Sequence, residues 1–111
     1  VIVIGHRGHV EVEGIVGHFP PHAPGVIAVI ETADEVDTLR IPDEDAVAYV
    51  TQTTLAVDEA RRIADRLRSR FPRLSDPRAD TICYATQNRQ NAVRSIAAEC
   101  ELLLVIGAPH S

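Results

Sequence analysis

Four short apolar runs recur along the chain, and longer polar or amphipathic segments separate them. The runs cover residues 1–4, 26–30, 46–50 and 102–106. Strands that are apolar on both sides are typical of parallel sheets with helices on both faces. The pattern therefore predicts an α/β fold with a mostly parallel four-stranded sheet and helices on both of its faces. The length of 111 residues fits a single α/β domain, 1–111.

Apolar residues at helical spacing fill the segments between these runs. Short helices are expected over residues 11–18 and 32–39, and Thr32 has the sequence context of a helix cap. A longer amphipathic helix is expected to follow Asp58 and to stop before Pro72, because proline cannot continue a helix.

A last helix is expected to begin at Thr86, whose hydroxyl can cap its N-terminus. The apolar stripe of this helix predicts a buried face. That face consists of Ala92, Val93, Ile96, Ala97 and Cys100. Cys100 is therefore expected to be a small buried hydrophobic residue.

Composition excludes several classes of function. The net charge of -5 and the pI near 5.4 leave no basic surface for phosphate backbones, so we expect no nucleic-acid partner. No apolar run approaches the length of a membrane span, so we expect no membrane partner. The two cysteines stand in unrelated settings, which argues against a disulfide framework and favours a cytoplasmic location.

The two ends of the chain suggest a piece of a longer protein. The sequence contains no Met, begins directly on a core strand and stops at Ser111, in the loop after the last predicted strand. A natural domain seldom ends inside a functional loop. We therefore expect residues 1–111 to be an internal fragment of a larger enzyme.

Ligands of parallel α/β sheets bind beyond the carboxyl ends of the strands. This rule brings together His9 and Glu11 after the first strand, Thr51–Thr54 after the third and Ser111 after the last. The first of these turns is bracketed by glycines and precedes a helix, so its backbone N–H groups and the helix dipole favour an anion. The sequence predicts a site for a small anionic ligand at this edge of the sheet.

Three of these residues have chemistry that suits such a site. Glu11 is a candidate proton donor, because a carboxyl group in a dry crevice can have its pKa raised into a working range. His9 is a candidate phosphate contact or proton shuttle. Thr53 is a candidate partner for a substrate alcohol. The ordinary alternatives are a first-turn glutamate, a solvated histidine and a threonine that caps a helix.

Cys83 differs from these residues because its thiol can become a strong nucleophile or a metal ligand. It stands just before the N-terminus of the last helix, where the helix dipole stabilises a thiolate. A thiolate attacks electrophiles or binds metals, and a single cysteine does not specify which. Both roles remain open from the residues alone.

Four separated motifs occur along the chain in a fixed order and together span nearly all of it. They are Ile4-Gly5-His6-Arg7-Gly8-His9-Val10-Glu11-Val12-Glu13-Gly14, Val50-Thr51-Gln52-Thr53-Thr54-Leu55, Arg70-Phe71-Pro72 and Ile82-Cys83-Tyr84-Ala85-Thr86-Gln87-Asn88-Arg89-Gln90. With these motifs the chain resembles the 4-hydroxy-3-methylbut-2-enyl diphosphate reductase family, also called LytB.

The resemblance implies an iron–sulfur oxidoreductase of the non-mevalonate isoprenoid pathway. Such an enzyme reductively removes the hydroxyl of its substrate to give isopentenyl and dimethylallyl diphosphates. The family has three similar α/β domains around a central cluster, and this chain looks like one of them with the start of the next. The implied partners are an allylic diphosphate, an electron donor such as ferredoxin or flavodoxin, and the remaining domains.

The resemblance also implies a role for individual residues. His9 looks like the histidine that contacts the diphosphate, and Glu11 like the acid that protonates the departing hydroxyl. Thr53 looks like the threonine that hydrogen-bonds the substrate hydroxyl or its proton relay, and Ser111 like the start of the diphosphate loop. Cys83 looks like one of three cysteine ligands of a 4Fe–4S cluster. The other two ligands are expected outside this chain, so the isolated fragment is expected to be inactive.

Two positions depart from the family pattern. Val10 stands where a proline is common, and Ala56 stands where a serine usually opens the helix that follows the threonines. Losing a cap of this kind typically costs about 1 kcal/mol of stability.

Two other interpretations remain open from the sequence. The first is a zinc site built from His6, His9, Glu11 and Cys83, since zinc favours nitrogen and sulfur ligands. The second is a non-catalytic α/β module that holds a phosphorylated ligand at its strand ends.

Overall fold

A parallel sheet forms the centre of the computed structural model, which describes residues 1–77 and 81–107. Its three strands have the order β2-β1-β3. They are β1 (Ile2–Ile4), β2 (Ala28–Ile30) and β3 (Tyr49–Thr51). All three residues of β1 are completely buried, as expected for the central strand of a sheet that is covered on both faces.

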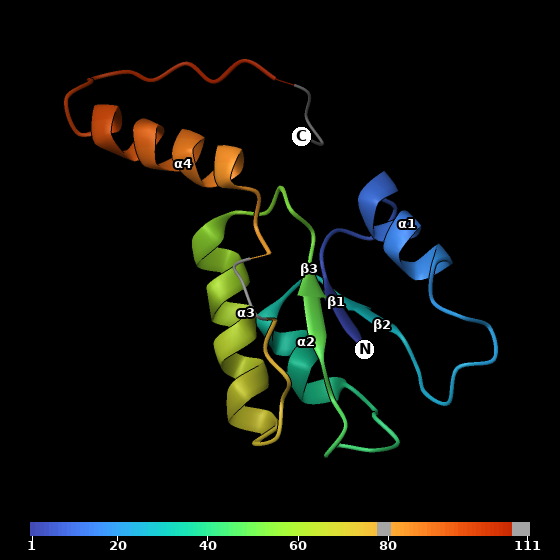
Figure 1. The fold of residues 1–111 in the computed structure, drawn as a ribbon. Coiled ribbons are helices and arrows are strands. Elements are labelled where there is room, and N and C mark those ends of the chain that lie inside the picture. Colours follow the sequence, from blue (N-terminus) through green and yellow to red (C-terminus); the bar gives the residue numbers. More distant parts are fainter. Residues whose placement is uncertain (78–80, 108–111) are drawn as a thin grey trace.

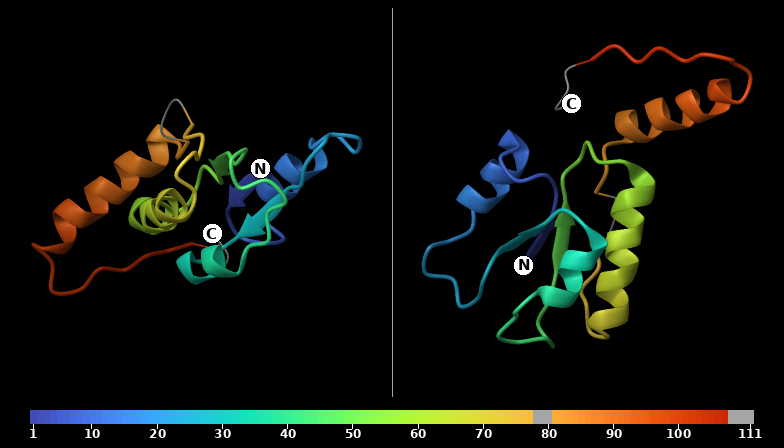
Figure 2. Two further views of the ribbon diagram at one scale, coloured as in Figure 1. Left: turned by 90° about the horizontal axis from the view of Figure 1, so that it is seen from below. Right: turned by 180° about the vertical axis from the view of Figure 1, so that it is seen from behind.

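Helices cover both faces of the sheet (Figures 1 and 2). Helices α2 (Ala33–Thr38) and α3 (Val57–Arg70) pack together on one face. Helix α1 (Val10–Gly17) lies on the other side, where its buried residue Val12 packs beside Gly5. The predicted α/β class and its parallel pairing are confirmed.

The main core lies between the sheet and α3. Residues Ala60, Ile63, Ala64 and Leu67 form the buried stripe of α3, because their spacing places them on one side of the helix. Acidic residues in the first turn and arginines in the last turn oppose the ends of the helix dipole. The helix ends at Phe71, which is buried in the same core.

Among the described residues the sheet has three strands and not the four that were predicted. Residues 102–106 are exposed and adopt no strand, and Ile106 is 97% exposed. A strand needs a neighbouring backbone to satisfy its N–H and C=O groups, and none pairs with this run in the described part of the chain. The apolar run therefore remains extended but unpaired.

The last helix also differs from the prediction. Helix α4 (Tyr84–Ala97) begins after Cys83, which occupies the N-cap position that was assigned to Thr86. Its predicted buried face is exposed, and so is Cys100, because among the described residues no element covers that side of the helix. The prediction that Cys100 is buried is wrong.

The N-caps of the two short helices are His9 and Thr32. The Nδ1 atom of His9 accepts a hydrogen bond from the backbone N–H of Glu11 at 3.2 Å. Thr32 occupies the predicted cap position of α2, but its hydroxyl contacts the carboxylate of Glu35 at 3.5 Å instead of a backbone N–H.

Replacing Gly5 by alanine is expected to destabilise the fold by about 1–3 kcal/mol, because the new methyl group overpacks the core. Its Cβ would lie 2.6 Å from Cγ2 of Val12 and 2.9 Å from Cβ of Gln52. Urea denaturation measures the effect. Gly14→Ala is the matched control: it meets nothing within 4 Å and should gain up to about 1 kcal/mol of helix stability. Equal effects of the two substitutions would contradict the close packing at Gly5.

Candidate active site

The segments that follow β1 and β3 lie side by side at one edge of the sheet. The two strands pair in parallel, and the N–H of Gln52 continues the ladder with a hydrogen bond of 2.8 Å to the carbonyl oxygen of Ile4. Beyond this point β1 turns into the segment that carries His9 and Glu11, and β3 turns into Thr53. The predicted meeting of these two segments is therefore present.

Glu11 and Thr53 form the centre of the site. One carboxylate oxygen of Glu11 accepts from the backbone N–H of Thr53 at 2.8 Å, and the other accepts from the Thr53 hydroxyl at 3.1 Å. Both residues are half-buried. The carboxylate is thus held in one orientation beside a hydroxyl group, and once it is protonated it can pass its proton to that hydroxyl.

His9 stands at the start of α1, next to this pair. Because its Nδ1 atom accepts the hydrogen bond from Glu11, the proton of a neutral imidazole lies on Nε2. An Nε2–H group is a hydrogen-bond donor for an anion. The half-buried side chain and the N-terminus of α1 therefore offer donors at the same place.

Cys83 joins the site through the backbone of Thr53. Its N–H donates to the carbonyl oxygen of Thr53 at 2.9 Å, and its thiol is exposed. Thr53 consequently contacts both Glu11 and Cys83, which come from distant parts of the sequence. Ser111, the remaining predicted site residue, lies outside the described residues.

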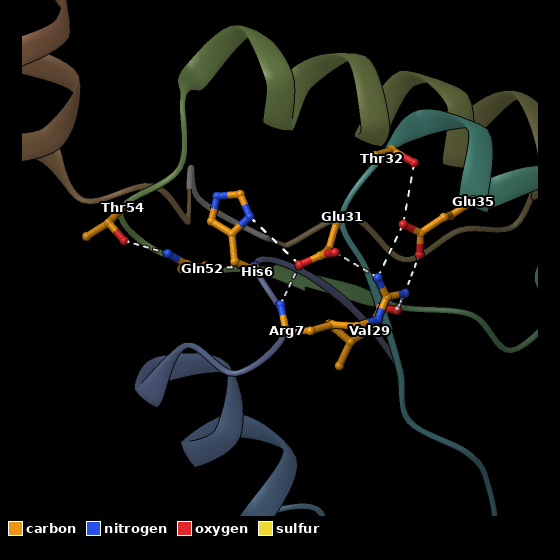
Figure 3. A network of polar contacts seen from close by, with 8 residues as sticks. All are labelled: His6, Arg7, Val29, Glu31, Thr32, Glu35, Gln52 and Thr54. Carbon is orange, nitrogen blue, oxygen red and sulfur yellow. Dashed lines mark hydrogen bonds and ion pairs between the residues drawn. The ribbon is translucent and has the colours of Figure 1, made fainter. Parts of the chain in front are cut away.

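Gln52 is a site residue that the sequence reasoning did not identify. Its side chain is only 2% exposed and bridges the two turns. The Oε1 atom accepts from the backbone N–H of His6 at 3.0 Å, and the Nε2 group donates to the Thr54 hydroxyl at 2.8 Å (Figure 3). The available signal in the sequence was an amide side chain among threonines, directly after an apolar run.

Arg7 lies in the anion-favouring turn, but its guanidinium group is occupied (Figure 3). It donates to Glu31 at 2.9 Å, to the carbonyl oxygen of Val29 at 2.8 Å and to Glu35. These hydrogen bonds and charges raise the pKa of Arg7 above its ordinary value and lower the pKa of the Glu35 carboxyl. Arg7 therefore anchors the turn to β2 and α2 and does not offer its charge to a ligand.

The four candidate zinc ligands do not gather at one point. The His6 ring faces Glu31 at 3.9 Å, whereas the Glu11 carboxylate faces Thr53. Among residues 1–77 and 81–107, no three His, Cys, Asp or Glu side chains form a group able to hold a metal ion. Of the four candidates, Cys83 has an exposed thiol, a group that can bind a metal as a thiolate.

No helix in the described ranges has both the length and the apolar character to cross a membrane.

The parallel α/β sheet brings an acid, a hydroxyl, an imidazole and a thiol together at its strand ends, the edge at which sheets of this class bind ligands. A sequence model of the family described as "LytB protein" matches residues 1–111, and the chain belongs to this family.

Relatives and a solved structure agree with this assignment. The 4-hydroxy-3-methylbut-2-enyl diphosphate reductase of Pseudomonas putida is 50% identical over 110 residues, which cover 99% of this chain and 35% of the relative. The reductase of the same name from Psychrobacter arcticus is 48% identical with the same coverage. The structure of the E-1-hydroxy-2-methyl-but-2-enyl-4-diphosphate reductase from Plasmodium falciparum matches with a TM-score of 0.85 and 38% identity, over 99% of this chain and 33% of that one. The chain thus spans about a third of the length of these relatives.

The network around Arg7 predicts a pH dependence of stability. The pKa of Glu35 in the folded chain lies below its usual value of 4.5, mainly because of the hydrogen bond from Arg7. The carboxylate therefore stabilises the fold above about pH 4.5, and this contribution is lost as the pH falls through the lower folded-state pKa. Glu35→Gln should lower the free energy of unfolding at pH 7 by about 1 kcal/mol or less, because the ion pair between Arg7 and Glu35 is partly exposed. The variant should also lose less stability than the parent chain as the pH falls below about 4.5.

Urea denaturation between pH 7 and pH 3 measures this effect. Glu99→Gln, at an exposed position after α4, is the control and should lose stability at low pH as the parent chain does. The same loss of stability at low pH in Glu35→Gln would contradict the proposed contribution of the Arg7 network.

Proposed function

We propose that this chain is part of a 4-hydroxy-3-methylbut-2-enyl diphosphate reductase. The whole enzyme would remove the hydroxyl of this allylic diphosphate reductively and give isopentenyl and dimethylallyl diphosphates in the non-mevalonate isoprenoid pathway. The observation that carries the proposal is the Glu11 carboxylate, which is hydrogen-bonded to Thr53 at the strand ends next to Cys83. The names of the relatives supply the substrate and the reaction class.

The residues of this chain suit the demands of the reaction. A departing hydroxyl must receive a proton, and Glu11 is the acid that delivers it, directly or through the Thr53 hydroxyl. The diphosphate needs donors, which His9 and the N-terminus of α1 supply without a basic surface. Ser111 is proposed to contribute to the same diphosphate site.

Cys83 is proposed as one ligand of an iron–sulfur cluster of the 4Fe–4S type. When bound, such a cluster supplies electrons and a Lewis-acidic iron for an alcohol oxygen. Cys83 would hold it beside Thr53, and the other cysteine ligands would come from outside this chain. A small electron carrier such as ferredoxin or flavodoxin is the proposed reductant.

The relation to the whole enzyme is also a proposal. This chain would be one of three similar α/β domains together with the start of the next, to which residues 102–106 would contribute the first strand. The exposure of this apolar run supports that reading, because a further domain would cover it. The free cysteines suit a cytoplasmic location. The isolated fragment, with one cluster ligand, would be inactive.

Glu11→Gln in the full-length enzyme should lower kcat by about 10²–10⁴, because the amide keeps the shape of the side chain but cannot donate the proton. A reductase assay with the allylic diphosphate measures this. Glu13→Gln is the matched control, since Glu13 lies in the same helical turn but is exposed. Full activity of Glu11→Gln would remove Glu11 from the mechanism.

Cys83→Ser in the full-length protein should abolish assembly of the cluster, because a hydroxyl is a poor ligand for iron in place of a thiolate. Iron and sulfide analysis after reconstitution, together with the visible absorption spectrum, measures the loss. Cys100→Ser is the control and should keep both, as its thiol lies beyond the other end of α4. Stoichiometric zinc without iron or sulfide in the parent protein would favour the zinc interpretation instead.

A further inference from the structure

Helix α4 is joined to the rest of the described chain by hydrogen bonds and an ion pair. It lies across the N-terminal end of α3 and extends away from the sheet (Figure 1). In the described part of the chain none of its residues is buried, and Val93 and Ile96 are 43% and 50% exposed. Within the described part of the chain, polar contacts are what join this helix to the rest of the domain.

Gln90 makes the central polar contact. Its Oε1 atom accepts from the backbone N–H of Val57 at 2.9 Å, and its Nε2 group donates to the carbonyl oxygen of Leu55 at 2.9 Å. Both ends of the half-buried amide are thus bonded to the backbone that leads from Thr53 into α3. A two-point contact fixes the orientation of α4 as well as its position.

The contact also explains how α3 begins without a capping side chain. Ala56 occupies the N-cap position, and alanine has no oxygen to offer the free N–H groups of the first turn. The Gln90 amide oxygen accepts one of them, that of Val57. A side chain from another helix thus accepts the N–H of the first residue of α3, whereas an N-cap serine would accept that of the second or third.

The other contacts of α4 lie toward its two ends. The N–H of Cys83 bonds to the carbonyl oxygen of Thr53, and Arg94 forms an ion pair with Asp58 at 2.6 Å. The side chains of Arg94 and Asp58 are 50% and 67% exposed, and ion pairs of that kind contribute little to stability. The contacts of Gln90, by comparison, are partly buried.

We propose that Gln90 is a positioning residue for Cys83. Its amide docks α4 on the segment that carries Thr53, and it thereby holds the thiol at the N-cap of α4 beside the Glu11–Thr53 pair. The effect of Gln90 on a bound iron–sulfur cluster rests on the proposed function of Cys83 as a cluster ligand. A ligand that is held by a second layer of hydrogen bonds gives a metal centre a defined geometry.

The experiment separates positioning from simple helix capping. Gln90→Leu, which keeps the size of the side chain, is made in the full-length protein that contains this chain, alone and together with Ala56→Ser. The serine restores a cap to α3 but cannot dock α4. Arg94→Gln is the control for loss of a surface contact on the same helix.

Three measurements follow the variants: the Tm, amide hydrogen exchange at Cys83 in cluster-free protein, and the EPR spectrum of the reduced, reconstituted protein. Gln90→Leu should lower the Tm by about 2–4 °C and speed exchange at Cys83 about tenfold. The added Ala56→Ser should restore the Tm but leave the exchange fast and the EPR signal altered. Arg94→Gln should match the parent in all three.

Unchanged exchange at Cys83 in Gln90→Leu, or restoration of exchange and EPR signal by Ala56→Ser, would overturn the proposal and leave Gln90 as a cap. A reconstituted parent protein without iron and sulfide would overturn the proposed function instead. In that case the exchange rate at Cys83, measured without a cluster, still decides whether Gln90 positions this residue.

Discussion

The parallel pairing of β1 with β3 extends one residue beyond the strands, where the N–H of Gln52 meets the carbonyl oxygen of Ile4 at 2.8 Å. The acid side of the site, with Glu11 and Thr53, depends on this extension. It sets the register in which Gly5 and Gln52 pack without space for another carbon atom. That register in turn places Glu11 against both donors of Thr53. Parallel pairing is thus the constraint that converts two distant turns into one site.

Although the chain is acidic, the proposed site offers hydrogen-bond donors to an anion. The one arginine of the first turn is neutralised by Glu31 and Glu35, so it stiffens the turn and adds no free positive charge. Donors come instead from an imidazole and from the start of α1. Such donors are local and directional, which suits recognition of a small ligand more than long-range attraction of a polyanion.

The thiol side of the site is held differently from the acid side. Glu11 is fixed by a helix that rests on the sheet, whereas Cys83 stands at the start of a helix with no buried residue among those described. Its position depends on backbone and amide hydrogen bonds to residues 53–57. Such hydrogen bonds define orientation but each contributes only modestly to stability.

The apolar runs were enough to predict the α/β class and the parallel sheet, because burial on both faces is a property of the strand residues themselves. The meeting of Glu11 with Thr53 followed from the shared edge of parallel strands. The strand expected at 102–106 did not form, since a strand exists only with a partner backbone. The bridging roles of Gln52 and Gln90 became visible in the folded chain alone, because a side-chain amide finds its partners through packing between segments that are distant in sequence.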